Sequence, residues 1–234
     1  MQSINILRLA LVTLFFFPAH SVAGEIGGRI TVTRRITKNR LVTTGYQPRG
    51  PVIEGPSTPA SSSEYQHIVV FLEGEGLERP KPVNERIRQK NRAFTPGLVV
   101  IPVGSTLSFP NDDSIFHNIY SLSNAKSFDL GYYPQNESRS ITVAKPGVIR
   151  IYCHIHKEMS AAILVAPNRW YTKVPENGNF RFSNVPPGEY KLVVWHKSAG
   201  FFRRNITVPE SGEVQAVMDI PTGGQSVGTA PNAK

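Results

Sequence analysis

Hydrophobic and polar residues alternate, or apolar residues form short blocks, along most of the chain beyond residue 28. The blocks that precede residue 167 are 29–37, 67–74, 97–104, 106–110, 117–123, 138–144, 147–153 and 161–166. Turn-forming residues separate them. A period of two with frequent turns is typical of short β-strands in a sandwich, so the pattern predicts an all-β protein.

A second group of strand-like blocks follows residue 167, joined by the turn sequences ENGN and NVPPGE. Three stretches differ from this pattern. Residues 82–92 (PVNERIRQKNR) fit a short helix with Asn84 as its cap. Residues 47–64 are rich in proline and serine and predict a loose linker, and the glycine-rich tail at 223–234 predicts disorder.

The chain begins with an apolar run that ends near Phe17 and is followed by the small residues Ser21, Val22 and Ala23. This order predicts a secretory signal peptide cleaved after about Ala23. The run is shorter than the ~20 residues of a membrane-spanning helix. We therefore expect an exported, periplasmic protein with no stable membrane insertion.

The chain is basic, with 26 lysines and arginines against 17 acidic residues and a formal net charge of +9. Removal of Arg8 with the signal peptide leaves +8. A positive field favours encounter with an acidic partner, so we expect an acidic redox protein. The basic residues are dispersed and no nucleic-acid-binding motif is present, which argues against nucleic acid as a partner.

The chain has one cysteine, Cys153, in the stretch YCHIHKEM. A lone thiol in an oxidising compartment needs protection by burial or by a metal bond. His156 and Met159 follow on the loop between two expected strands, and His117 starts an earlier strand. Two imidazoles, one thiolate and a weak thioether are the donors of a blue-copper site. The pattern therefore predicts a mononuclear copper site.

Other interpretations of these residues are weaker. A buried cysteine or methionine is usually part of a core, but here they occur together with both histidines. Zinc also binds cysteine and histidine, although methionine is a poor zinc ligand. One cysteine excludes a dinuclear copper centre, and the single H-x-H pair at residues 154–156 excludes a trinuclear cluster. Nothing marks a cysteine hydrolase, so no enzymatic activity is expected.

Residues 67–166 resemble the cupredoxins, the family of plastocyanin and amicyanin. The resemblance rests on VGSTLSFPN at 103–111, HN at 117–118, KPG at 145–147 and the Y-C-x-x-H-x-x-M motif at 152–159. It implies a Greek-key sandwich that binds one copper ion per chain. A chain of this kind followed by a small β domain is similar to exported proteins called methylamine-utilisation-like.

The resemblance assigns the site residue by residue. His117, Cys153 and His156 would be the strong ligands and Met159 the axial one. The backbone N–H of Asn118 would donate to the cysteine sulfur and tune the thiolate. His154 departs from the pattern, and it remains an alternative to Met159 as fourth ligand.

Residues 178–195, GNFRFSNVPPGEYKLVVW, resemble the carboxypeptidase regulatory-like sandwich, which is transthyretin-like. Some relatives of that fold bind carbohydrate. No cluster of aromatic residues marks a sugar platform in this sequence, so carbohydrate is a weak expectation here.

The expected organisation follows from these segments. It consists of a signal peptide (1–23), an N-terminal strand and Pro/Ser-rich linker (24–66), a cupredoxin domain (67–166), a regulatory-like sandwich (167–222) and a disordered tail (223–234). An alternative order is also open. Strands 29–37 and 67–74 could begin the second sandwich, with the cupredoxin domain inserted into it.

The expected function is one-electron transfer. Electrons would pass through the exposed edge of His156, beside an apolar patch that includes Met159, Ala161 and Ala162, while Lys157 and Arg139 attract the partner. A copper-holding or partner-binding envelope module without electron transfer is the main alternative. A structural β protein without metal is the third.

Overall fold

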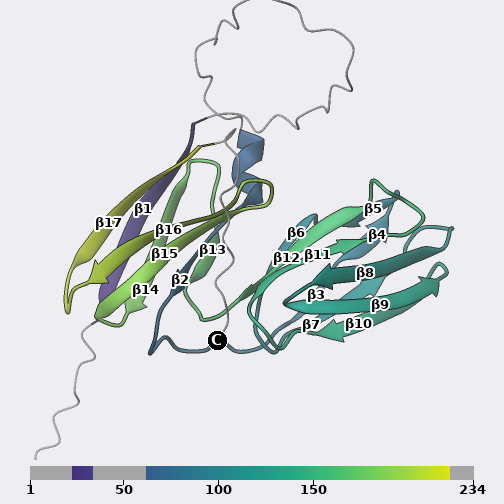
Figure 1. The fold of residues 1–234 in the computed structure, drawn as a ribbon, viewed down its shortest axis with the longest axis horizontal. Helices are drawn as coiled ribbons and strands as arrows, with labels where there is room; N and C mark the ends of the chain where they lie inside the picture. Colours follow the sequence, from purple (N-terminus) through teal and green to yellow (C-terminus); the bar gives the residue numbers. More distant parts are fainter. Residues whose placement is uncertain (1–22, 34–61, 222–234) are drawn as a thin grey trace, which may run out of the picture.

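A computed structural model describes residues 23–33 and 62–221, and its strands form four sheets and one two-stranded hairpin (Figure 1). The prediction of an all-β fold is confirmed for these residues. The helical element of the described part is a 3-10 segment, η1 (Ser62–His67). The predicted signal peptide and tail, and most of the predicted linker, lie outside the described residues.

One pair of sheets combines strands from both ends of the chain. Its three-stranded sheet has the order β14 (Asn179–Val185), β1 (Gly24–Val32) and β17 (Glu213–Ile220). Its four-stranded sheet has the order β13 (Tyr171–Lys173), β2 (Ile68–Glu73), β15 (Gly188–His196) and β16 (Gly200–Val208). The apolar faces of these two sheets share one core, which includes Ile30, Leu72 and Val194.

The other pair of sheets comes from the middle of the chain. Its five-stranded sheet has the order β6 (Leu98–Pro102), β12 (Ser160–Ala166), β11 (Gly147–Tyr152), β8 (His117–Ser123) and β9 (Lys126–Tyr133). Its three-stranded sheet has the order β10 (Ser138–Thr142), β7 (Thr106–Pro110) and β3 (Asn84–Arg86). Strands β4 (Arg88–Lys90) and β5 (Ala93–Thr95) form the hairpin. A second core, which includes Phe109, Ile149 and Ile163, lies within this pair.

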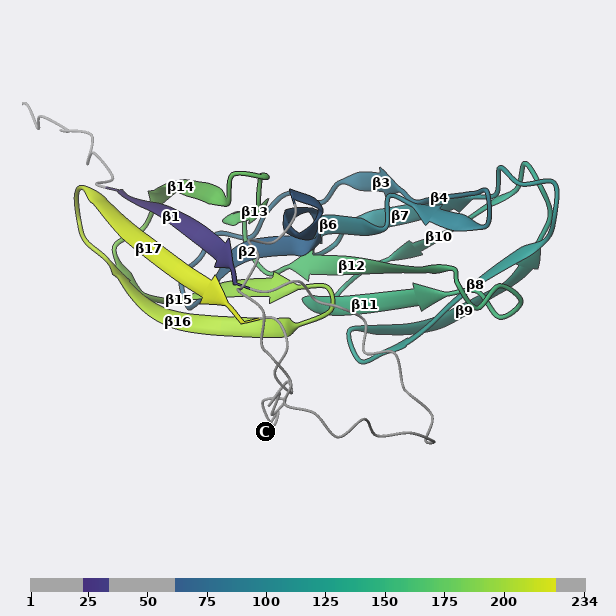
Figure 2. The same cartoon turned by 90° about the horizontal axis from the view of Figure 1, so that it is seen from above.

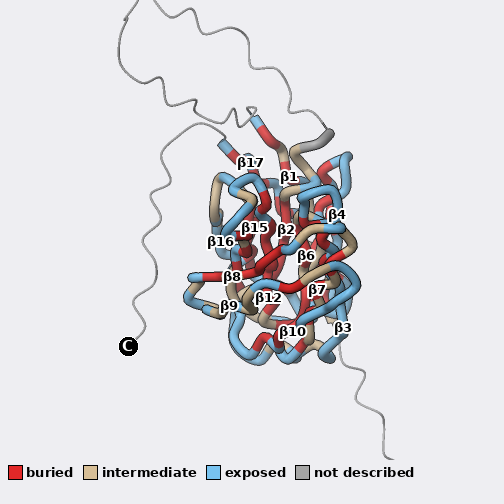
Figure 3. Tube along the Cα trace, turned by 90° about the vertical axis from the view of Figure 1, so that its right-hand side faces the viewer, coloured by how far each residue is buried: buried red, intermediate tan, exposed pale blue. Residues whose placement is uncertain are grey.

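A third core joins the two pairs of sheets. Alternate residues of β2, β12 and β15 leave their own cores and pack together, among them Phe71, Leu164 and Val193. These strands are therefore buried on both faces, which explains why their sequences are continuous apolar runs rather than alternating ones. Figure 2 shows the two pairs side by side, and in Figure 3 the central strands are mostly buried while the outer loops are exposed.

The strand pairing differs from the expected boundary at residue 67. Strand β2 pairs with β15 and β13, and strand β1 pairs with β14 and β17. Residues 68–73 therefore belong to the sheets that contain the C-terminal strands, as the insertion alternative requires. The two-sided burial of β2 explains the misplacement, because a continuous apolar strand fits either sandwich equally well.

The helix expected at residues 82–92 is wrong. This segment contains β3 and β4 instead. Ile87 and Gln89 are buried while Arg86, Arg88 and Lys90 are exposed, which is the period of two of a strand.

Within residues 23–33 and 62–221, no helix has the length and apolar character needed to cross a bilayer.

Candidate metal centre

The candidate centre lies where β8 begins and β11 ends, at one end of the five-stranded sheet. These strands are antiparallel neighbours, so His117 at the start of β8 is brought near Tyr152 at the end of β11. Residues 153–159 then connect β11 to β12. Figure 2 shows this connection at the end of the molecule that is remote from the β14–β1–β17 sheet.

Three of the predicted ligands come together there. The Nδ1 atoms of His117 and His156 are 3.1 Å apart. The Sγ atom of Cys153 is 3.7 Å from the same His156 nitrogen. Donor atoms of all three residues lie within 4.8 Å of one another, and no second group of this kind occurs in the described part of the chain.

The centre is buried except at one histidine. His117 is fully buried and Cys153 is only 4% exposed, whereas His156 is partly exposed. Burial shields the thiol from oxidants, as the lone cysteine requires. The partly exposed ring of His156 gives the centre its contact with the surface.

Met159 lies at the end of the same loop. Its backbone N–H donates to the carbonyl oxygen of His156 at 3.0 Å, which folds the loop back. Its side chain is 1% exposed and packs in the same core as Cys153. Coordination by its sulfur stays a prediction.

The second nitrogen of His117 has a partner that the sequence analysis did not identify. Its Nε2 lies 2.8 Å from the Asp113 carboxylate. Burial by itself would raise the pKa of Asp113, but hydrogen bonds from the Arg92 and Asn91 backbone and from His117 outweigh it and lower that pKa. The spacing of four residues between Asp113 and His117 was the available signal, but it is informative only once the loop conformation is known.

His154 lies apart from the three donors. Its ring stacks on Tyr120 with centroids 3.9 Å apart, and its Nε2 is 3.3 Å from the Asp129 carboxylate. The side chain is 44% exposed. Strand β11 ends at Tyr152, so these contacts rather than a continuing strand hold His154 apart from the donors, and the choice between His154 and Met159 as fourth ligand stays a prediction.

Asn118 follows His117 in β8 and is fully buried. Its side-chain Nδ2 donates to Asp129 at 2.6 Å. Asp129 also accepts the Gly131 N–H, and these hydrogen bonds lower its pKa despite the opposing effect of burial. The hydrogen bond from the Asn118 backbone to the cysteine sulfur stays a prediction.

The residues expected to form an apolar patch beside His156 are buried. Met159, Ala161 and Ala162 are each at most 2% exposed, so they do not form a surface. Two apolar residues adjacent in sequence to the ligands are exposed instead, Phe116 at 56% and Ile155 at 50%. The expected patch failed because β12 is buried on both faces from its second residue onward.

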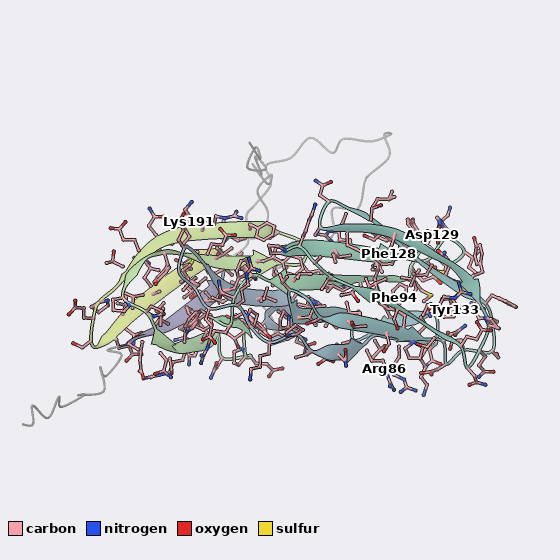
Figure 4. The ribbon with its side chains drawn as sticks, turned by 90° about the horizontal axis from the view of Figure 1, so that it is seen from below. Arg86, Phe94, Phe128, Asp129, Tyr133 and Lys191 are labelled. Atoms are coloured by element: carbon pink, nitrogen blue, oxygen red, sulfur yellow. The ribbon has the colours of Figure 1, made fainter. Side chains whose placement is uncertain are left out.

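A buried tyrosine supports the β8 edge of the centre. Tyr133 pairs with His117 across the sheet. Its hydroxyl accepts a hydrogen bond from Gln89 Nε2 at 2.6 Å and donates to the Phe109 carbonyl at 2.9 Å. Burial raises the pKa of Tyr133 well above its ordinary value. Figure 4 shows Tyr133 and Asp129 toward the same end of the molecule, away from Lys191.

No protein-family model matches the sequence, and no curated protein matches it. Solved structures do. A copper-containing nitrite reductase from Thermus scotoductus is 24% identical over 42% of this chain, with a TM-score of 0.36, and this chain spans only 25% of its length. A purple cupredoxin from Nitrosopumilus maritimus is 26% identical over 35% of this chain and 99% of its own, with a TM-score of 0.32. A reduced amicyanin variant is 14% identical over 41% of this chain and 97% of its own, with a TM-score of 0.34.

Two of these neighbours, the purple cupredoxin and the amicyanin variant, are cupredoxins matched over almost their whole length, whereas the third is a nitrite reductase matched over a quarter of its own. Each of the three covers less than half of this chain. The regulatory-like assignment of the other pair of sheets is not tested by them and stays a prediction.

Proposed function

We propose that this protein is an exported one-electron carrier that holds one copper ion per chain. His117, Cys153 and His156 are the strong ligands in this proposal and Met159 is the weak axial ligand. The observation that carries it is the convergence of one donor atom from each of His117, Cys153 and His156 within 4.8 Å.

Two of the three donor separations are close to those expected for a metal ion bound in a trigonal plane, and the third is within 4.8 Å. Metal bonds of about 2.0 Å to nitrogen and 2.3 Å to sulfur separate such donors by roughly 3.5 to 3.8 Å. The observed separations of 3.1 and 3.7 Å are close to these values. A soft thiolate combined with two imidazoles favours copper, and bound copper supplies the Cu(I)/Cu(II) couple.

The surroundings suit electron transfer. His117 lies in β8 and Cys153 directly follows β11 and packs in the core of this pair of sheets, so the ligand geometry changes little between oxidation states. The partly exposed His156 provides the route to a partner, and the exposed Ile155 precedes it in the chain. The exposed Lys157 lies next to His156 in the chain and would attract an acidic redox partner.

Voltammetry of the copper-loaded mature protein tests the carrier function. A carrier gives a reversible one-electron couple that is lost in Cys153→Ser. Copper bound without a reversible couple would contradict electron transfer and favour the copper-holding envelope module.

The predicted role of Lys157 can be tested separately with a small anionic oxidant, ferricyanide. We expect Lys157→Glu to slow oxidation of the reduced protein, most strongly at low salt. Lys191→Glu is the matched control, because Lys191 is also exposed but lies on the other pair of sheets (Figure 4). Equal rates for the two variants would contradict electron exchange at the His156 end.

A further inference from the structure

The two ring nitrogens of His117 face different partners. Nδ1 points to His156 at 3.1 Å, and Nε2 lies 2.8 Å from the Asp113 carboxylate. An ionised carboxylate can only accept a hydrogen bond. In a neutral His117, Nε2 therefore carries the hydrogen and Nδ1 presents its lone pair to the centre. The contact between the two Nδ1 atoms then requires His156 to donate its own Nδ1 hydrogen when no metal is bound.

Asp113 is itself held by the turn between β4 and β5. Its carboxylate accepts the backbone N–H of Asn91 at 2.6 Å and of Arg92 at 2.9 Å. Both turn residues have positive φ angles, of 55° and 54°. Positive φ angles at both central residues define the type I′ turn, which suits a two-residue hairpin loop. Glycine normally occupies one of these positions. The conformation directs two adjacent N–H groups at one carboxylate.

The loop that carries Asp113 is fixed to the same hairpin. Arg88 donates to the Asp112 carboxylate at 2.5 Å, and the Asp112 N–H donates to the Gln89 carbonyl at 2.9 Å. Within the loop, the buried Asn111 accepts the Asp113 N–H at 3.0 Å. These contacts restrain Asp113 from both its side chain and its backbone.

We propose that Asp113 is a positioning residue of the metal centre, and that the β4–β5 hairpin fixes His117 through it. The carboxylate selects the His117 tautomer, orients the ring and makes the imidazole a stronger donor, as partners of metal-bound histidines do. This inference rests on the proposed copper site, but its first test does not.

That first test uses the copper-free parent protein with 15N-labelled histidine at pH 8. Long-range 1H–15N spectra report which ring nitrogen carries hydrogen. We expect the Nε2–H tautomer for His117 and the Nδ1–H tautomer for His156. An Nδ1–H tautomer at His117 would overturn the inference, whether or not the protein binds copper.

The second test compares copper-loaded variants. Asp113→Asn keeps the size of the side chain but removes its charge, and we expect its Cu(II) affinity to fall about 10- to 100-fold. The reduction potential should rise, because the lost charge stabilised Cu(II) more than Cu(I). A tenfold loss confined to Cu(II) corresponds to about 59 mV.

Matched variants separate positioning from stability. Asp219→Asn removes an exposed carboxylate on β17, in the other pair of sheets, and it should leave affinity and potential unchanged. Asp113→Glu keeps the charge and should lie nearer to the parent than Asp113→Asn. Parental affinity and potential in Asp113→Asn would overturn the inference. If Asp113→Asn does not fold, the tautomer spectra decide. Failure of the parent to bind copper would refute the proposed function alone.

Discussion

The Lys173 ammonium donates a hydrogen bond to the carbonyl oxygen of Leu98 at 2.8 Å, between strand β13 of one pair of sheets and β6 of the other. Burial lowers the pKa of Lys173, and the charge of Glu85 opposes this effect. Lys197 makes a similar contact with the Gly97 carbonyl at 3.1 Å. Together with the third core, these bonds join the two pairs of sheets.

The third core should therefore contribute to the stability of the whole protein. Leu164 is 1% exposed and lies in this core. We expect Leu164→Ala to lower the free energy of unfolding by about 2–5 kcal/mol, because it leaves a cavity between two sheets. Val217→Ala, at a residue 57% exposed, should change it by less than about 0.5 kcal/mol. Urea unfolding followed by tryptophan fluorescence measures both. Equal effects would mean that the interface is not a packed core.

The buried Tyr133 hydroxyl gives a second prediction. Tyr133→Phe leaves Gln89 Nε2 and the Phe109 carbonyl without their partner. An unsatisfied buried polar group costs about 1–3 kcal/mol. We therefore expect Tyr133→Phe to lower the free energy of unfolding, measured with urea, by at least about 1 kcal/mol. The neighbouring Tyr132 is 51% exposed and Tyr132→Phe serves as control. A loss no larger than that of the control would contradict the assigned hydrogen bonds.

Acid should destabilise the protein through His196. This residue is fully buried, its Nδ1 accepts the N–H groups of Ser198 and Ala199, and its Nε2 lies 3.4 Å from Glu64. Burial lowers the pKa of His196, Glu64 opposes this, and His67 adds to it. The unfolded chain therefore binds a proton below about pH 6.5 that the folded protein binds only at lower pH.

This difference in proton binding between the folded and unfolded states sets the direction of the pH dependence. The free energy of unfolding should fall as pH drops from about 6.5 through the folded pKa of His196. Thermal unfolding at pH 7.5 and 5.0 measures the loss, and we expect a smaller loss in His196→Gln. His154→Gln, at an exposed histidine, should keep the parental loss. The same loss in His196→Gln as in the parent would show that another group causes the acid sensitivity.

Some parts of the site were predictable from sequence and others were not. Cys153, His156 and Met159 share one short loop, so their spacing alone predicts proximity, and His117 follows from strand pairing. The contact between Asp113 and His117 depends on a loop held by the Asn91–Arg92 turn, whose conformation no periodicity reports.

The fold shows the same limit. The alternating strands were found from their pattern, whereas β2 was assigned to the wrong sheets because strands buried on both faces have no alternation. The helix expected at residues 82–92 failed because β3 and β4 are only three residues long each. In strands this short, the helix-forming sequence and the apparent cap at Asn84 outweigh the two or three positions that alternate between buried and exposed.

Cys153, His117 and His156 are proposed to hold one copper ion. The most direct measurement is a visible absorption titration of the mature protein with Cu(II), beside Cys153→Ser. We expect an intense blue or green thiolate-to-copper band that saturates at one equivalent and is absent in the variant. A folded parent protein that shows no such band, or a band that persists in Cys153→Ser, would contradict this proposal.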